Sequence, residues 1–232
     1  MGKIHVTING KACEANAGET ILKIATDNGI EIPTLCYMKE KNEIGACRIC
    51  IVEATMTRGL VTACVYPVSE GMEIQTNSEK VRKARKTTLE LILSTHDKKC
   101  LSCPRSTDCE LQKLCLEYGV DEDAFDGFKP VYEIDTSTPH LVRDNNKCIL
   151  CRRCVAACNE QYVGVIGAND RGIDTNIGSP FNRLLRDVPC ISCGQCTVVC
   201  PTGALTVKDD TDKVMEAIAD PSKYVVVQTA PS

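Results

Sequence analysis

Alternating apolar and polar residues open the chain and predict a β-hairpin over residues 3–15, with Asn9-Gly10 as its two-residue turn. A short helix is expected over residues 18–29, because Gly-Glu-Thr begins it and Asn-Gly ends it. Further apolar runs predict strands at 50–54 and 60–65. The amino-terminal part of the chain is therefore expected to combine a small sheet with one helix.

Residues 79–95 predict a longer amphipathic helix, because apolar and small residues recur at three- and four-residue spacing. The face expected to be buried consists of Val81, Ala84, Thr88, Leu91, Ile92 and Thr95. The opposite face is basic and consists of Arg82, Lys83, Arg85 and Lys86. We interpret this basic face as solvated surface, with docking on an acidic partner as the alternative.

The second half of the chain contains fewer regular patterns. Residues 119–139 are acidic and loop-like, so we interpret them as a connector. Val163–Ile166 and Gly172–Ile177 are expected to pair as an extra hairpin. Asp212–Ala219 predicts a helix, and Tyr224–Val227 predicts a strand of the buried type. Such a strand at the end of the sequence would expose an edge, so we expect it either to dock on a partner or to continue into a longer chain.

Composition changes this picture, because the 232 residues include 17 cysteines but only 4% aromatic residues. Few large rings make a poor core, and bound metal clusters can replace part of it. The formal net charge of −4 is weak and argues against nucleic-acid binding. The sequence shows no signal peptide and no apolar stretch near the ~20 residues of a membrane helix. We therefore expect a cytoplasmic protein of an anaerobe whose cysteines bind metal.

Two runs of cysteine dominate the chain: Cys148-x2-Cys151-x2-Cys154-x3-Cys158 and Cys190-x2-Cys193-x2-Cys196-x3-Cys200. Each has the spacing that wraps a [4Fe–4S] cluster, and in such pairs the fourth cysteine of each run ligates the other cluster. The spacing resembles that of two-cluster bacterial ferredoxins, except that Asn159 follows the first run in place of proline. Zinc sites and disulfides are the alternatives. We assign one cluster to Cys148, Cys151, Cys154 and Cys200, and the other to Cys158, Cys190, Cys193 and Cys196.

Four cysteines in the amino-terminal third, Cys36, Cys47, Cys50 and Cys64, suit a [2Fe–2S] cluster, which needs two thiolates per iron. Small residues before Cys47 let backbone N–H groups turn toward the sulfides. The spacing resembles the [2Fe–2S] site of the large iron–sulfur subunit of respiratory complex I. The preceding hairpin, helix and strands resemble the β-grasp ferredoxin fold. A structural zinc site is the alternative.

His96-x3-Cys100-x2-Cys103-x5-Cys109 fits either zinc or iron–sulfur chemistry when taken alone. Its place between a [2Fe–2S] motif and two [4Fe–4S] motifs resembles complex-I-type chains and iron-only hydrogenases, where this motif holds a His-ligated [4Fe–4S] cluster. A neutral imidazole in place of a thiolate removes one negative charge. Because charge is one control on reduction potential, we expect His96 to raise the potential of this cluster.

Several reactive residues have no place in these motifs. Cys13 lies in a strand pattern and is interpreted as a small buried residue. Cys115 lies in a helix-like stretch, where a core role is favoured and a spare ligand is the alternative. His5 and His140 have no metal-like neighbours and are interpreted as surface residues. Phosphate-binding glycine motifs are absent, so the sequence predicts no nucleotide site.

The order of the motifs resembles the amino-terminal half of multi-cluster [FeFe]-hydrogenases, including the iron–sulfur subunit of NAD(P)-linked, electron-bifurcating enzymes. The resemblance extends over residues 224–232, which look like the entry into the catalytic domain that holds the H-cluster. It implies an α+β fold with a β-grasp [2Fe–2S] domain, a small helical His-ligated [4Fe–4S] domain and a two-cluster bacterial ferredoxin-like domain. The expected boundaries are 1–78 and 79–118 for the first two domains, 119–139 for a linker, 140–210 for the two-cluster domain, and 211–232 for the lead into a missing catalytic domain.

The resemblance implies that this chain carries electron transfer only, with no catalytic residue of its own, as part of an enzyme that oxidises or evolves hydrogen. The expected cofactors are one [2Fe–2S] and three [4Fe–4S] clusters, with the H-cluster beyond residue 232. FMN and NAD(P) would lie on other subunits. The expected partners are a flavin- and NAD(P)-binding subunit, a small [2Fe–2S] subunit and soluble ferredoxin, in a hetero-oligomer without nucleic acid.

Two alternatives lead to different experiments. The first is a complete diaphorase-type iron–sulfur subunit of an NAD-linked nickel–iron hydrogenase, or the corresponding part of a formate dehydrogenase. A stop codon after Ser232 would favour a complete subunit, and a continuing reading frame with further cysteines would favour the [FeFe]-hydrogenase. The second is a zinc-stabilised interaction protein without redox chemistry. It would be colourless, whereas an iron–sulfur protein is brown.

Overall fold

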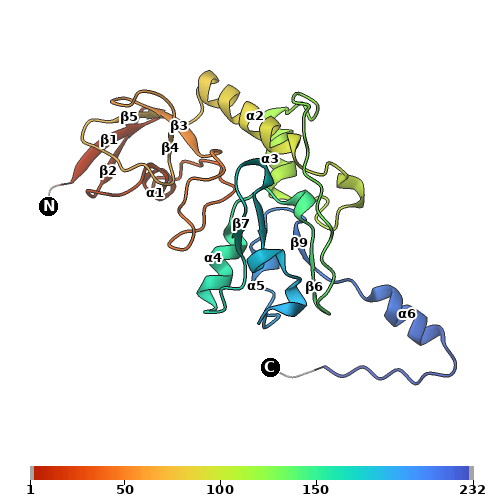
Figure 1. Cartoon of the computed structure of the whole chain (residues 1–232). Coiled ribbons are helices and arrows are strands. Elements are labelled where there is room, and N and C mark those ends of the chain that lie inside the picture. Colours follow the sequence, from red (N-terminus) through yellow and green to blue (C-terminus); the bar gives the residue numbers. More distant parts are fainter. Residues whose placement is uncertain (1–2, 230–232) are drawn as a thin grey trace.

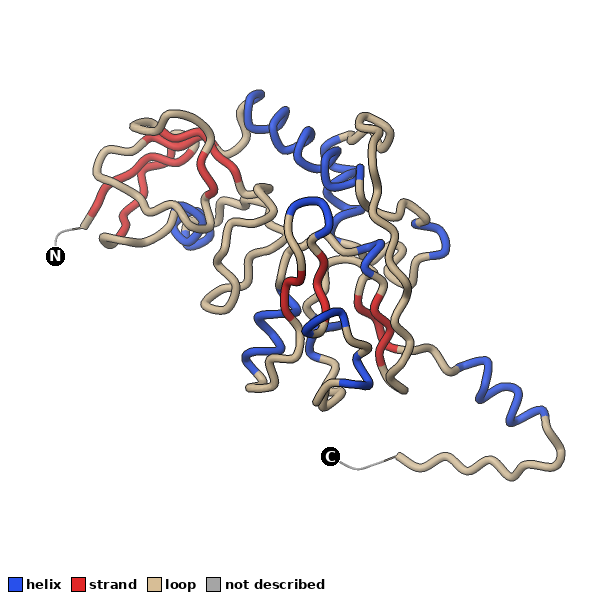
Figure 2. The backbone as a smooth tube through the Cα atoms, in the orientation of Figure 1, coloured by secondary structure: helices blue, strands red, loops and turns tan. Residues whose placement is uncertain are grey.

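The computed structural model describes residues 3–229, which form three consecutive regions (Figure 1). A β-sheet with one helix lies at the amino-terminal end, the helices α2 and α3 follow, and a cysteine-rich region of short elements comes next. Helix α6 and the segment after it project away from the rest (Figure 1). Loops make up much of the cysteine-rich region (Figure 2). The arrangement is α+β, as the sequence predicts.

A mixed five-stranded sheet, in the order β2-β1-β5-β3-β4, forms the first region. β1 and β2 make the predicted hairpin, and Asn9 and Gly10 have φ angles of 51° and 82°, as a two-residue turn of this type requires. β1 also pairs with β5 in parallel. The two strands predicted downstream are confirmed, although the second is reduced to two residues. The strands are β1 (Ile4–Ile8), β2 (Lys11–Ala15), β3 (Ile51–Ala54), β4 (Val61–Thr62) and β5 (Glu73–Gln75).

Helix α1 (Ile21–Asp27) packs against this sheet and is the short helix that the sequence predicts. It begins at Thr20, whose side chain accepts a hydrogen bond from the Lys23 N–H and so satisfies one free donor of the first turn. Its apolar residues and those of the sheet share one core, which also contains Cys13, 4% exposed. The structural role predicted for Cys13 is confirmed.

Helix α2 (Glu79–Ser94) has the predicted length but a different buried face. Its most buried residues are Val81, Arg85, Leu89 and Leu93, whereas Leu91 is 51% exposed. The prediction that Arg85 belongs to a solvated basic face is therefore wrong. The physical reason is that the Arg85 guanidinium finds three hydrogen-bond acceptors inside the protein. α2 packs on α3 (Glu110–Tyr118), which ends at Gly119 in the left-handed conformation.

The cysteine-rich region is built on two pairs of short antiparallel strands. β6 (Leu141–Arg143) pairs with β9 (Leu205–Val207), and β7 (Gly167–Asn169) pairs with β8 (Asn176–Gly178). The predicted extra hairpin thus exists, but its first strand lies after Val163–Ile166. Val165 and Ile166 pack into the core around the cysteines and so do not pair. The helices of this region are α4 (Arg153–Glu160), α5 (Gln195–Val198) and the 3₁₀ helices η2 (Asn145–Lys147), η3 (Gly172–Asp174), η4 (Pro180–Asn182) and η5 (Leu185–Asp187). A further 3₁₀ helix, η1 (Cys100–Ser102), lies between α2 and α3.

The connector before this region is loop-like, as predicted, and is anchored at its end. Asp135 forms an isolated bridge with Arg143, and its Oδ2 accepts a hydrogen bond from Arg143 Nη2 at 3.1 Å. Both side chains are buried. Burial raises the pKa of Asp135, but hydrogen bonds from Ser137 and the Leu185 N–H, together with the Arg143 charge, outweigh it and lower the pKa overall. This charged pair fixes where the linker meets the sheet.

The end of the described chain differs from its prediction. Helix α6 (Thr211–Ala219) forms as expected but buries no residue. Residues 224–227 form no strand within residues 3–229, and Tyr224 is 94% exposed. The predicted strand is not formed within the described chain, because no described strand lies beside it to pair with, and its docking on a partner stays a prediction. Positions 230–232 lie outside the described residues. No helix in the described part combines the length and apolar character needed to cross a membrane.

Candidate metal centres

By motif, the sixteen candidate ligands fall into four groups: the first-region group (Cys36, Cys47, Cys50 and Cys64), the His96 group (His96, Cys100, Cys103 and Cys109) and the two sets of four cysteines from the two runs. Over residues 3–229, no three His, Cys, Asp or Glu side chains converge tightly enough to hold one metal ion. The eight cysteines of the two runs, at 148–158 and 190–200, line two cavities. A cluster takes its thiolates from around a group of atoms, and cysteines that line one cavity provide that arrangement.

The first cavity is lined by four cysteines from both runs: Cys148, Cys151, Cys154 and Cys200. The first three come from the loop before α4 and from the start of α4 itself, and the fourth comes from the second run. Cys158 follows Cys154 by four positions on α4, so the helix carries the two thiols about one turn apart. Cys158 does not line this cavity.

The second cavity is lined by the other four cysteines of the two runs: Cys158, Cys190, Cys193 and Cys196. Cys196 lies on α5, which packs against α4. Each cavity therefore takes three cysteines from one run and the fourth cysteine from the other run: Cys200 lines the first cavity and Cys158 the second. The backbone bends sharply at Leu150, Arg152 and Ser192, which have φ angles of 55°, 60° and 54°. These left-handed residues turn successive cysteines toward a shared centre.

Burial controls the charge of these thiols. It raises the pKa of Cys148 to about 12 and those of Cys151 and Cys196 to about 11, and the pKa of Cys154 lies well above its ordinary value. The charges of neighbouring cysteines raise these pKa values further. Without metal the thiols are therefore neutral. Bound iron would favour the thiolates, so cluster binding would be coupled to release of protons.

The cysteines of the first region form two adjacent pairs. The Cys50 and Cys64 sulfurs lie 3.3 Å apart. A hydrogen bond from Cys47 lowers the pKa of Cys36 to about 6 and raises that of Cys47. The Ile49 N–H donates to the Cys47 sulfur, as backbone donors do around iron–sulfur sites. Two pairs of thiols fit a cluster that takes two thiolates per iron.

His96 follows the end of α2 and is 7% exposed. Its Nδ1 is buried and has no hydrogen-bond partner among the described residues. Burial, together with the nearby Lys129 charge, lowers its pKa to about 4, so the imidazole is neutral. A buried nitrogen of this kind calls for a partner, and a metal would supply one. The three accompanying thiols come from the loop between α2 and α3: Cys100, Cys103 and Cys109.

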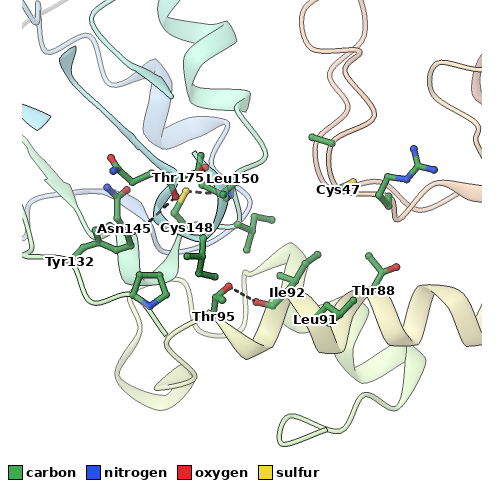
Figure 3. A pocket seen from close by; sticks show the side chains of 17 residues that line it. Cys47, Thr88, Leu91, Ile92, Thr95, Tyr132, Asn145, Cys148, Leu150 and Thr175 are labelled. Atoms are coloured by element: carbon green, nitrogen blue, oxygen red, sulfur yellow. Dashed lines mark hydrogen bonds between the residues drawn. The ribbon is translucent and has the colours of Figure 1, made fainter. Parts of the chain in front are cut away.

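Contacts between distant residues connect the groups. Asn42 is buried, and its Nδ2 donates to the backbone oxygens of Cys36, at 2.6 Å, and Cys151, at 3.0 Å. It therefore joins the first-region group to the first cavity. A further cavity beside these groups is lined by Cys47, Cys148 and residues of α2 (Figure 3).

The His96 group abuts the same first cavity. The Cys109 sulfur lies 3.6 Å from the Pro201 oxygen, and the Glu110 N–H donates to that oxygen at 3.1 Å. Glu110 also accepts two hydrogen bonds from Arg153, at 2.7 and 2.9 Å, in a bidentate pair. Pro201 follows Cys200, so ligand-bearing segments of both groups are in contact.

These connecting residues were missed by the sequence analysis. None of Asn42, Glu110 and Arg153 is a ligand of any motif. Cys151 lies 109 residues from Asn42, and Arg153 lies 43 residues from Glu110. Only a pattern of co-variation between positions would reveal such pairs. Spacing along the chain carries no signal for them.

The unassigned residues lie apart from the four groups or at their edge. Cys115 is partly buried on α3, and burial, with the charges of Cys109 and Cys100, raises its pKa to about 12. The favoured core role is consistent with this packing. His5 Nδ1 lies 3.3 Å from Glu70 at the surface, and His140 is exposed.

Three family models match successive parts of the chain. A "2Fe-2S iron-sulfur cluster binding domain" matches residues 2–79, an "NADH-ubiquinone oxidoreductase-G iron-sulfur binding region" matches residues 85–124, and a "4Fe-4S dicluster domain" matches residues 147–204. The chain therefore contains two-iron and four-iron cluster-binding domains, in the order that its motifs predict.

Two relatives are similar over nearly the whole chain. It is 42% identical, over 100% of its length, to the NADP-reducing hydrogenase subunit HndD of Solidesulfovibrio fructosivorans, of which it covers 41%. It is 38% identical, over 98% of its length, to iron hydrogenase 1 of Clostridium pasteurianum, of which it covers 40%. The chain thus spans about two fifths of the length of these curated relatives.

A solved structure matches at both the sequence and the fold level. A chain in the crystal structure of an NAD+-reducing [NiFe]-hydrogenase in the H2-reduced state has a TM-score of 0.82 and 32% identity, over 88% of this chain and 87% of that one. This chain belongs to the family of iron–sulfur electron-transfer subunits that includes components of NAD(P)-linked hydrogenases. The match covers most of both chains, so the two chains share the order of regions as well as the separate domains.

Proposed function

We propose that the chain holds one [2Fe–2S] and three [4Fe–4S] clusters and conducts electrons through them. The observation that carries this proposal is the exchange of Cys158 and Cys200 between the two cavities. A paired-cluster ferredoxin site requires that exchange, whereas two independent zinc sites do not. The proposed ligand sets are Cys36, Cys47, Cys50 and Cys64 for [2Fe–2S], and His96, Cys100, Cys103 and Cys109, then Cys148, Cys151, Cys154 and Cys200, then Cys158, Cys190, Cys193 and Cys196 for the [4Fe–4S] clusters.

Clusters of this kind accept and release single electrons without a change of bonding partners. The protein's own residues would fix where each cluster lies. Buried Leu141, Ile166 and Ile177 surround the paired cavities and keep water from them. Asn42 and the Glu110–Arg153 pair hold the first-region group and the His96 group against the first cavity. Electrons would then pass between either of these two groups and the second cavity by way of the first cavity.

The whole enzyme is proposed to be a hydrogenase linked to NAD(P)H and ferredoxin. Support comes from the relative described as an NADP-reducing hydrogenase subunit, which is 42% identical over the full length of this chain. On this proposal the H-cluster lies outside residues 1–232. A flavin- and NAD(P)-binding subunit, a small [2Fe–2S] subunit and soluble ferredoxin would exchange electrons with this chain in a hetero-oligomer.

A second candidate is the iron–sulfur subunit of an NAD-linked nickel–iron hydrogenase. The observation that favours it is the likeness to a chain from such an enzyme, at 32% identity and a TM-score of 0.82. Purification of the natural complex under anaerobic conditions would separate the two. Stoichiometric nickel favours the second candidate, and a longer iron-only polypeptide that carries this sequence favours the first.

The proposed electron transfer through four clusters is tested by iron and sulfide analysis of protein purified without oxygen. A redox titration monitored by low-temperature EPR follows. We expect about fourteen irons per chain, which corresponds to one two-iron and three four-iron clusters. We also expect signals from both cluster types. Pale, redox-silent protein that contains zinc would refute the proposal.

Replacement of His96 by cysteine should leave a cluster in place but lower its reduction potential. A thiolate adds one negative charge where the neutral imidazole was, and this disfavours the reduced state. The measurement is the EPR midpoint of that cluster in the full chain. His140→Cys is the matched control, since His140 is exposed and belongs to none of the four groups. An unchanged midpoint in His96→Cys would remove His96 from the ligand set.

A further inference from the structure

Arg85 is a buried charged residue that no proposed role accounts for. It lies in the middle of α2 and is 2% exposed. Its Nε donates to the Ile49 oxygen at 2.9 Å, its Nη2 to the Ile51 oxygen at 2.8 Å and its Nη1 to the Tyr118 hydroxyl at 3.0 Å. Every described partner is neutral, and Arg85 has no carboxylate partner among the ion pairs of residues 3–229.

A guanidinium in such a place needs a compensating negative charge. Neutral acceptors satisfy its hydrogen bonds but leave its charge in a medium of low polarity, which is unfavourable. Its two backbone partners, Ile49 and Ile51, flank Cys50 in the sequence. The thiolates of the proposed [2Fe–2S] site would supply the negative charge that compensates Arg85.

The same hydrogen bonds fix the backbone that carries the ligands. Ile49 accepts from Arg85 through its oxygen, while its N–H donates to the Cys47 sulfur. A shift of Ile49 would therefore move a donor away from a ligand. Tyr118 ties the arrangement to α3, and Arg82 lies over the Tyr118 ring at 5.2 Å. Helices α2 and α3 thus hold the backbone segment 49–51, which contains the candidate ligand Cys50.

We propose that Arg85 is a positioning residue for the two-iron site that also compensates the negative charge of the ligand thiolates. This inference rests on the proposed [2Fe–2S] ligand set. The positive charge stabilises the more negative, reduced state, so it raises the reduction potential of this site. The hydrogen bonds to Ile49 and Ile51 keep the backbone donors directed at the sulfurs.

The test uses three substitutions in the full chain. Arg85→Lys keeps the charge but loses the fork of donors, Arg85→Gln keeps donors without the charge, and Arg85→Met removes both. Lys83→Met is the matched control, because it removes one charge from an exposed position of the same helix. The readouts are the EPR midpoint of the two-iron cluster, its iron content and the thermal unfolding temperature.

We expect a more negative midpoint in Arg85→Gln and Arg85→Met than in the unaltered protein, and a smaller change in Arg85→Lys. Lys83→Met should match the unaltered protein. If Arg85→Met does not fold, the comparison of Gln with Lys gives the same answer. Lower unfolding temperatures with unchanged midpoints would show a purely structural role and overturn this inference alone. Absence of a two-iron signal in the unaltered protein would overturn the proposed [2Fe–2S] site and this inference with it.

Discussion

Substitution of Cys158 by alanine is expected to damage the cluster of the second run, although Cys158 belongs to the first run in the sequence. Cys158 lines the cavity of Cys190, Cys193 and Cys196 and not that of its own neighbours. Loss of this ligand should lower the iron content by up to about four per chain, out of about fourteen. Iron analysis and EPR of anaerobically prepared protein measure the effect.

Double variants decide which cluster has been damaged. Cys158→Ala combined with Cys193→Ala should lose no more iron than the more damaged single variant, because both thiols would serve one cluster. Cys158→Ala combined with Cys151→Ala should lose about twice as much, because the two changes would act on separate clusters. The opposite pattern would contradict the exchange of cysteines between runs.

Gly203→Ala is expected to disrupt the His96 group from a different region of the chain. A Cβ atom at Gly203 would lie 2.6 Å from the Cys103 sulfur, which is closer than any real contact of this kind. A free cysteine could rotate away at little cost. A cysteine bound to iron is held in place, so the added methyl group should break that bond and cost up to about four irons per chain.

Gly167→Ala provides the control for this prediction, since a Cβ atom at Gly167 meets nothing within 4 Å. It should leave iron content and EPR signals unchanged. The readout for Gly203→Ala is the EPR signal of the His-ligated cluster, together with total iron. Full iron content and an unaltered spectrum would show that Cys103 is free to move, and would remove it from the ligand set.

Local patterns predicted part of the regular structure. The hairpin at Asn9-Gly10 and helices α1, α2 and α6 follow from turn residues, caps and apolar periodicity, which act between residues a few positions apart. The buried face of α2 was not predictable in this way. Arg85 appears polar in the sequence, and only the carbonyl groups of Ile49 and Ile51 make its burial favourable.

Two other segments have strand composition but form no strand within the described chain. Val163–Ile166 has the composition of a strand, but it packs among the cysteines while the next three residues pair with β8. Residues 224–227 have the composition of a buried strand, but no described strand lies beside them. In both segments, β propensity measures fitness for a pleated surface and says nothing of whether a partner is present.

The sequence by itself determined which residues are the candidate ligands and in which order the cluster-binding regions follow one another. Ligand spacing within one motif is a local property, because a short loop directs the first three thiols of each run to one centre. Only the tertiary structure decided which centres touch. Asn42 bridges Cys36 and Cys151, and Gly203 faces Cys103, across about 100 residues of chain. Such contacts arise when separate regions pack together, and no short-range pattern records them.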